Sequence, residues 1–116
     1  MRGLSATEQA GLASKRIPAG GTYLLRDPMT GQVMRTGRSN DLQRRAAEHG
    51  RDPALRDLQF EPVHRTDVYS QQRGLEQLLH EIHNPPLNNI RPISLTNPYR
   101  QGYLDAAQEF LQGGNR

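Results

Sequence analysis

A short turn between two strand-like runs is the feature that most constrains how this chain can fold. The turn spans Asp27 to Gly31, where Pro28 fixes φ early and Gly31 can adopt positive φ at the end. Residues 22–26 before it and residues 32–36 after it contain aliphatic, aromatic and β-branched side chains. The pattern therefore predicts a β-hairpin over residues 22–36.

A helix is expected soon after this hairpin, over residues 42–49. Residues 37–39 lead into it, and Ser39, Asn40 or Asp41 can cap its first turn. Gly50 follows the last expected turn, where glycine commonly ends a helix. The chain should therefore pass from the hairpin into a short helix with little intervening loop.

One face of this helix combines apolar and functional side chains. Leu42, Arg45, Ala46 and His49 follow the i, i+3, i+4, i+7 spacing and so share a face. Because Leu42 and Ala46 are apolar, that face should meet the sheet. It would carry Arg45 and His49 inward, whereas Arg44 points to the opposite side.

The remaining chain predicts one further strand and two helices. Residues 59–68 can supply a third strand, and residues 69–83 show the clearest helical periodicity. Residues 87–97 form an irregular, Asn- and Pro-rich connection, and residues 98–112 form a final helix. The expected core stripe of the 69–83 helix is Leu75, Leu78, Leu79 and Ile82.

These elements predict an α+β domain over residues 22–112, with a small, mainly antiparallel sheet of three strands flanked by helices. A length of 116 residues fits one domain. Residues 1–21 are interpreted as a leader or linker from a longer chain, with a short helix possible over residues 5–14. Residues 113–116 are interpreted as a tail.

Composition excludes several classes of function. The chain has no cysteine, which rules out disulfides, thiolate zinc sites and cysteine nucleophiles. No signal peptide and no apolar run long enough for a membrane span are found. The formal net charge is +3, and Lys15 is the only lysine among 15 basic residues. Arginine grips phosphate with two hydrogen bonds, but a GC-rich genome would explain the arginine bias equally well.

The order of short motifs resembles the core of the GIY-YIG nuclease family. In that family, two strands of a hairpin carry the two named motifs, a following helix carries an essential arginine, and a later helix carries an acidic metal ligand. The matching segments are Tyr23-Leu24-Leu25, Arg35-Thr36-Gly37, Asn40-Asp41-Leu42, Arg45, His49, Leu75-Glu76-Gln77 and Pro86-Leu87-Asn88. Arg35 stands where the family's second motif has a tyrosine.

The resemblance implies divalent-metal-dependent hydrolysis of DNA. It assigns Glu76 as the ligand of Mg²⁺ or Mn²⁺ and Arg45 as the clamp on the phosphoryl oxygens. Tyr23 or His49 would take a proton from the attacking water. Arg35 and Arg38 would hold the phosphate or assist the base. Contacts with DNA are expected from Arg35, Arg38, Arg44 and Arg45, and supporting roles from Asn88 and His80.

A narrower resemblance concerns the Arg-Thr-Gly-Arg form of the second motif and the segments 87–94 and 97–99. These are similar to C-terminal toxin domains of bacterial polymorphic toxins. Such domains are delivered from the producing bacterium into the cytoplasm of a competitor and neutralised by a cognate immunity protein. The resemblance therefore implies DNA and an immunity protein as partners. A housekeeping repair or recombination nuclease, a silent nucleic-acid-binding module and an RNA substrate are the alternatives.

Several candidate residues also have simpler interpretations. Arg45 could lie on the helix surface, and Glu81 flanks the leucine stripe as Glu76 does, so that only the motif favours Glu76. His80 and His83 share a stripe with Glu76 and could form a metal-binding set, although structural or solvent-facing histidines are the simpler interpretation. His64 is expected at the surface.

Overall fold

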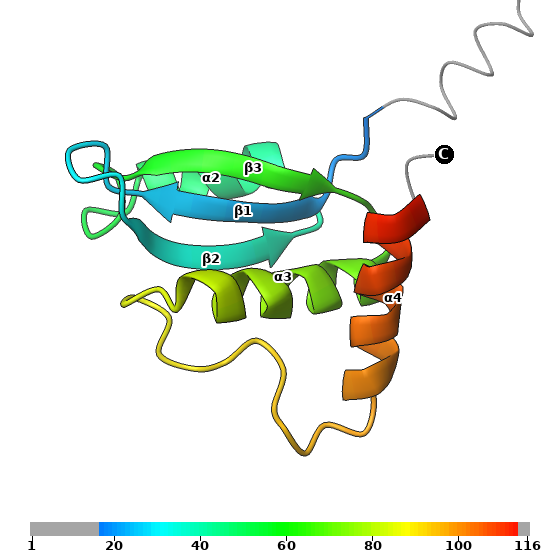
Figure 1. Cartoon of the computed structure of the whole chain (residues 1–116). Coiled ribbons are helices and arrows are strands. Elements are labelled where there is room, and N and C mark those ends of the chain that lie inside the picture. The colour runs from blue at the N-terminus through cyan, green and yellow to red at the C-terminus, as the bar shows by residue number, and fades with distance from the viewer. Residues whose placement is uncertain (1–16, 114–116) are drawn as a thin grey trace, which may run out of the picture.

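The computed structural model describes residues 17–113, which form a three-stranded antiparallel sheet and three helices. The strands are β1 (Gly21–Arg26), β2 (Val33–Ser39) and β3 (Gln59–Arg65), in the spatial order β2-β1-β3 (Figure 1). The helices are α2 (Leu42–Gly50), α3 (Tyr69–His83) and α4 (Arg100–Gly113). The predicted α+β class is confirmed, while the short helix expected over residues 5–14 lies outside the described residues.

The hairpin of β1 and β2 forms as predicted. In its turn, the Gly31 N–H donates to the Asp27 carbonyl at 2.7 Å, and Gly31 has a φ of 76°. The second strand, however, does not end at residue 36. Residues 37–39, which were expected to lead into the helix, pair with residues 21–23 because β1 offers free backbone groups along its whole length.

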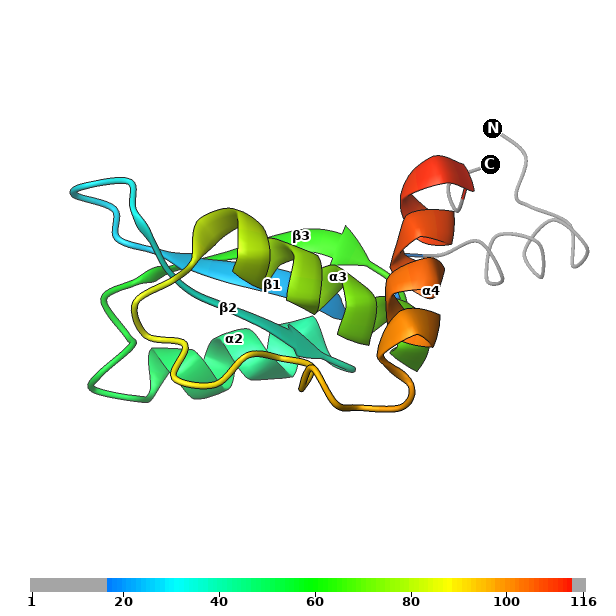
Figure 2. The same ribbon diagram turned by 60° about the horizontal axis from the view of Figure 1, so that its bottom comes forward.

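The two faces of the sheet are covered by different helices, with α2 on one side and α3 on the other (Figure 2). Side chains of β1 alternate between these faces. Tyr23 and Leu25 lie in one core cluster with Leu42 of α2. Leu24 lies in a second cluster with Leu79 of α3. The central strand thus contributes to both cores and fixes the distance between the two helices.

Helix α2 presents the face that the sequence predicts. Asp41 is its cap, accepting a hydrogen bond from the Arg44 backbone N–H at 3.0 Å. Leu42 and His49 are buried, Arg45 is partly buried, and Arg44 is exposed. The expected end at Gly50 is wrong, because Gly50 belongs to the helix and Arg51 is the C-terminal cap.

Helix α3 has the predicted bounds, but one of its expected core residues is exposed. Leu75 is fully buried, whereas Ile82 is 72% exposed. Gln72 and Gln77 are buried in addition, because α3 is covered by the sheet on one side and by later segments on another. Gln77 Oε1 accepts a hydrogen bond from the Ile93 N–H at 3.0 Å, which ties the irregular connection to α3.

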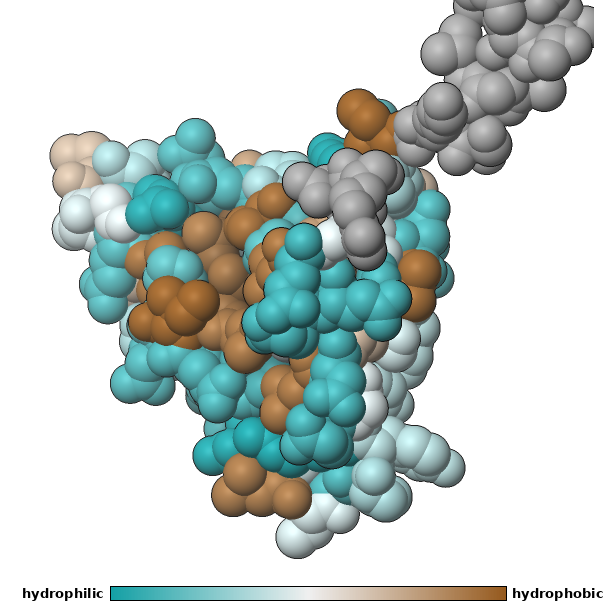
Figure 3. All heavy atoms as spheres, turned by 45° about the vertical axis from the view of Figure 1, so that its right-hand side comes forward, coloured by the Kyte–Doolittle hydropathy of each residue, from teal (hydrophilic) through white to brown (hydrophobic). Residues whose placement is uncertain are grey.

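Helix α4 packs against α3 and crosses it steeply (Figure 1). It begins at Arg100, two residues later than expected. Seen from the side of α4, apolar residues lie between broader hydrophilic areas of the surface (Figure 3). Between residues 17 and 113, no helix has both the length and the apolar character that a membrane crossing requires.

Candidate active site

A buried hydrogen bond joins Tyr23 of β1 to His49 of α2. The Tyr23 Oη and His49 Nε2 atoms are 2.9 Å apart, and the residues are only 3% and 7% exposed. Gly37 of β2 lies opposite Tyr23, and a Cβ at that position would overlap the tyrosine ring and its oxygen. Glycine is therefore required at position 37 if Tyr23 is to reach His49.

The surroundings favour the neutral form of both groups. Burial raises the pKa of the Tyr23 phenol, although the positive charges of Arg35 and Arg45 act in the opposite direction. Burial also lowers the pKa of His49, and the same two arginines lower it further. At neutral pH the pair is thus a phenol next to an uncharged imidazole, which can accept a proton from it.

Arg45 lies one turn before His49 on α2. Its Nη1 atom pairs with Glu48 Oε1 at 3.4 Å, an exposed pair along the same helix. Its Nε atom is buried and has no hydrogen-bond partner among residues 17–113. A buried N–H without a partner is costly, but this atom is closed off from solvent, so a ligand oxygen would reach it only if the Arg45 side chain moved.

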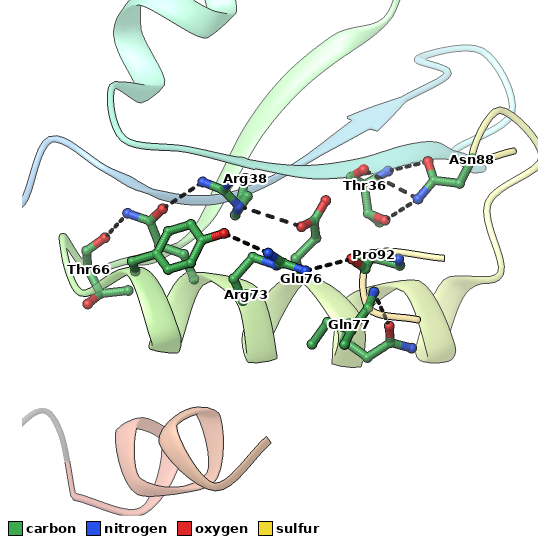
Figure 4. A network of polar contacts seen from close by, with 11 residues as sticks. Thr36, Arg38, Thr66, Arg73, Glu76, Gln77, Asn88 and Pro92 are labelled. Carbon is green, nitrogen blue, oxygen red and sulfur yellow. Dashed lines mark hydrogen bonds and ion pairs between the residues drawn. The ribbon is translucent and has the colours of Figure 1, made fainter. Parts of the chain in front are cut away.

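Glu76 approaches the same edge of the sheet from α3, with its carboxylate pointing toward β2 (Figure 4). The side chain is only 18% exposed, and its ion pair with Arg38 Nε is long, at 4.0 Å. Burial raises the pKa of the Glu76 carboxyl group, against the effect of Arg38, Arg73 and Arg35. A buried carboxylate with so loose a partner has oxygen atoms available for a divalent cation, which fits the predicted metal ligand.

A hollow of about 560 Å³ is lined by Arg45 and Glu76, whereas Tyr23 and His49 do not line it. We call it the Glu76 hollow; Arg38 of β2, Arg45 of α2, and Arg73 and Glu76 of α3 contribute its charged groups. A second, smaller hollow shares Glu76 and is lined by Arg35 and Asn88 among others. Three guanidinium groups around one carboxylate leave the Glu76 hollow positively charged, as a site for a phosphate requires.

The two arginines of β2 connect the two faces of the sheet. Arg38 lies on the α3 side, where its Nη1 donates to Gln72 Oε1 at 3.3 Å. Arg35 pairs across the sheet with Leu25, whose side chain belongs to the core on the α2 side. The charge of Arg35 nevertheless acts on Tyr23, His49 and Glu76 alike. Arg35 lies on β2, an edge strand, so its charge is close to groups on both faces of the sheet.

Asn88 closes the outer edge of β2. Its Oδ1 accepts from the Thr36 N–H at 3.2 Å, and its Nδ2 contacts Thr36 Oγ1 at 2.9 Å (Figure 4). The same Nδ2 lies 3.1 Å from His80 Nδ1. Asn88 and His80 therefore brace the strand that carries Arg35 and Arg38. The possible metal set of His80, Glu76 and His83 is not formed, since no three His, Asp or Glu side chains within residues 17–113 cluster suitably.

Two residues lie differently from their predicted roles. Arg44 does not line the Glu76 hollow; it binds Asn40 Oδ1 at 3.1 Å and pairs with Glu48 at 3.8 Å. His64, which was expected at the surface, is half-buried because its Nδ1 lies 2.9 Å from Thr22 Oγ1 and its ring meets Phe110 edge-on.

Sequence analysis did not find three residues of the site. Tyr69 and Arg73 belong to the same face of α3 as Glu76, at the spacing i, i+4, i+7, and that spacing could have identified them. Gln72 is buried and joins β2 to the segment before α3, because it contacts Arg38 and donates to the Thr66 carbonyl at 2.8 Å. A buried glutamine has no sequence signal of its own in an amphipathic helix.

Comparison with known proteins adds no identification. No known protein family and no curated protein matches this chain.

Proposed function

We propose that this chain is a divalent-metal-dependent DNA endonuclease that hydrolyses phosphodiester bonds. One observation carries the proposal: Arg45 of α2 and Glu76 of α3 line one hollow together, and the buried Tyr23–His49 hydrogen bond lies on the α2 side of the same sheet. These are the residues to which the GIY-YIG resemblance assigns the proton acceptor, the phosphate clamp and the metal ligand. The resemblance was drawn from sequence order alone, and the hollow that Arg45 and Glu76 share supports it from the structure.

The Tyr23–His49 pair supplies the proton acceptor in this mechanism. The Tyr23 oxygen takes a proton from the attacking water while it passes its own proton to His49 Nε2, so no free phenolate has to form against the raised pKa of Tyr23. The new P–O bond forms as the water loses this proton. The bond to the leaving oxygen breaks, and that oxygen is protonated by solvent.

Arg45 and the Glu76 ligand position balance the negative charge that grows on the oxygens of the scissile phosphate. Arg45 lines the hollow and would donate to one of these oxygens through its guanidinium group. Glu76 would hold Mg²⁺ or Mn²⁺, which supplies Lewis-acid stabilisation of the phosphoryl group and the leaving oxygen. Arg35 adds positive charge where the family has its second tyrosine.

We further propose that the nuclease acts as the toxin domain of an interbacterial effector, delivered into the cytoplasm of a competitor and neutralised by an immunity protein. The support is the second sequence resemblance. A housekeeping repair or recombination nuclease is the alternative among enzymes. A catalytically silent nucleic-acid-binding module is the alternative outside them, and the arginine at position 35 favours it.

Plasmid cleavage tests the proposed activity. Purified protein is incubated with supercoiled plasmid in Mg²⁺, in Mn²⁺ or in EDTA, beside Glu76→Gln and Glu81→Gln. Glu81 is an exposed glutamate of the same helix and is the matched control. We expect metal-dependent nicking or linearisation that Glu76→Gln abolishes and Glu81→Gln retains. Intact plasmid with wild-type protein under every condition would overturn the DNA endonuclease assignment.

Growth arrest tests the toxin role separately. Expression of the wild-type chain in bacterial cytoplasm should stop growth and degrade the chromosome, and Glu76→Gln should do neither. Normal growth with an active nuclease present would favour the housekeeping alternative.

A further inference from the structure

Arg73 lies beside Glu76 but has no part in the mechanism above. Its guanidinium group is held by four contacts, two of them hydrogen bonds. Nη1 donates to Tyr69 Oη at 2.6 Å, and Nη2 donates to the Pro92 carbonyl at 3.1 Å (Figure 4). The group also lies over the ring of Tyr103, 4.9 Å from its centroid, and 5.6 Å from that of Tyr69. Arg73 thereby joins α3, the irregular connection and α4.

This fixation leaves most of the hydrogen-bonding capacity of Arg73 unused. A guanidinium group has five N–H donors, and the two hydrogen bonds to Tyr69 and Pro92 use one donor each. Arg73 is only partly buried and lines the Glu76 hollow. Fixed guanidinium groups bind anions with little loss of side-chain entropy, so such a group is well prepared for a phosphate.

Arg38 contributes a second positive charge at the same place. Its guanidinium group lies over the ring of Tyr69, 4.7 Å from the centroid, and its Nη1 is held by Gln72. Tyr69 thus contacts both arginines, and the pKa of its phenol is lowered chiefly by the hydrogen bond from Arg73. Arg45, in contrast, reaches the hollow from the other side of the sheet. The hollow therefore has two separate sources of positive charge.

We propose that Arg73 and Arg38, held against Tyr69 and Tyr103, form a second phosphate-binding position that takes a non-scissile phosphate of the DNA. This inference rests on the proposed function, in which Arg45 and the Glu76 ligand position take the scissile phosphate. A phosphate on each side of Glu76 fixes the direction of the strand across the site. Arg73 is accordingly a substrate-positioning residue that recognises backbone and no particular base.

Binding measured without cleavage tests the inference. A short fluorescent DNA duplex is titrated with wild-type protein, Arg73→Gln and Arg56→Gln in EDTA, at several salt concentrations. Glutamine at position 73 removes the charge and preserves a polar side chain that can donate hydrogen bonds. Arg56 is an exposed arginine of the segment between α2 and β3 and controls for the loss of one charge. Thermal unfolding of each variant verifies that it folds.

We expect Arg73→Gln to weaken binding roughly tenfold, the effect of one charge-assisted hydrogen bond. The slope of log K against log salt should become shallower by about one, because one phosphate contact is lost. Arg56→Gln should change both quantities much less. Tyr69→Phe keeps both arginine charges but frees Arg73, so it should weaken binding and leave the slope near that of wild type.

Three results would overturn the inference. Wild-type affinity and slope in Arg73→Gln would show that Arg73 contacts no phosphate. A loss equal to that of Arg56→Gln would reduce its role to net charge, and a loss with an unchanged slope would indicate a structural effect. Any of these beside a cleaving wild type leaves the proposed function standing. A wild type that neither binds nor cleaves DNA would overturn both.

Discussion

Tyr23 Oη and His49 Nε2 lie 2.9 Å apart, although the two residues are 26 positions apart in the chain and come from a strand and a helix. The hydrogen bond is buried, and Phe60 of β3 stacks on the tyrosine ring with a centroid separation of 4.6 Å. The pair is therefore held by packing on several sides. Tyr23 and His49, which the sequence suggested as alternative proton acceptors, thus form one hydrogen-bonded pair.

Tyr23→Phe tests that pair with the smallest possible change. It removes the phenolic oxygen and preserves the ring that packs on Phe60. We expect plasmid cleavage to fall by roughly 100- to 10,000-fold, the usual contribution of a positioned proton acceptor. The free energy of unfolding should fall by only about 1 kcal/mol, for one lost buried hydrogen bond. Substantial cleavage by a folded Tyr23→Phe variant would remove Tyr23 from the mechanism.

The pH dependence of His49 provides a second test. Because burial lowers its pKa below the ordinary value of 6.5, folding favours the neutral imidazole. The stability that His49 contributes is present above pH 6.5 and is lost as the pH falls through the folded pKa. Cleavage should decline over the same acidic range. An NMR titration should place the pKa of His49 below 6.5 in the folded chain and near 6.5 in denaturant; a folded value at or above 6.5 would contradict this.

Glu76→Gln should separate stability from activity. Because burial raises the pKa of Glu76 above 4.5, the free energy of unfolding should decrease as the pH rises from 4.5 through the folded pKa. Glu76→Gln has no carboxylate to ionise in this buried position, so it should be more stable than wild type at neutral pH while losing cleavage. Thermal unfolding at pH 4 and pH 7 measures the difference.

Metal addition gives the same variant a second readout. Mg²⁺ or Mn²⁺ should raise the melting temperature of wild type, because a ligand that binds only the folded state stabilises it. Glu76→Gln should show no such rise, and the control Glu81→Gln should behave as wild type. An equal rise in all three proteins would place the cation elsewhere.

The contact between α3 and α4 can be tested with two helical glycines. A Cβ at Gly74 would overlap the Tyr103 carbonyl and approach Ala107 Cβ to 2.8 Å, whereas a Cβ at Gly102 would meet nothing within 4 Å. Gly74→Ala should therefore cost about 1–3 kcal/mol. Gly102→Ala should stabilise the chain by up to about 1 kcal/mol, because alanine favours helix. Denaturant unfolding compares them, and equal effects would contradict the close crossing of the two helices.

Features that depend on residues close in sequence were predicted correctly, and features that depend on distant residues were not. The hairpin turn, the bounds of α3 and the inward face of α2 follow from local spacing, and all were predicted. Ile82 was misassigned because helical periodicity identifies an apolar stripe but not which part of it is covered. The extension of β2 to Ser39 was missed because it depends on pairing with β1.

The candidate site shows the same division. Arg45 and His49 were placed together by helical spacing, and their meeting with Tyr23 follows from packing α2 on the sheet. Helical spacing could have placed Arg73 on the face of Glu76, but not its contacts with Tyr103 and Pro92, which lie far along the chain. Contacts of that kind leave no periodic signal in a sequence.

Because β1 is the central strand, the residues of the candidate site come together in a fixed order during synthesis. The hairpin partner β2 and helix α2 follow β1 directly, so Tyr23, His49 and Arg45 are all synthesised before residue 50. Glu76 comes later, and it reaches them only after β3 has paired with the other edge of β1 and α3 has folded back across the sheet. A ribosome-bound fragment that ends before α3 therefore lacks the acidic ligand altogether. In such a protein, synthesis itself delays the completed site until the residues of α3 have been made.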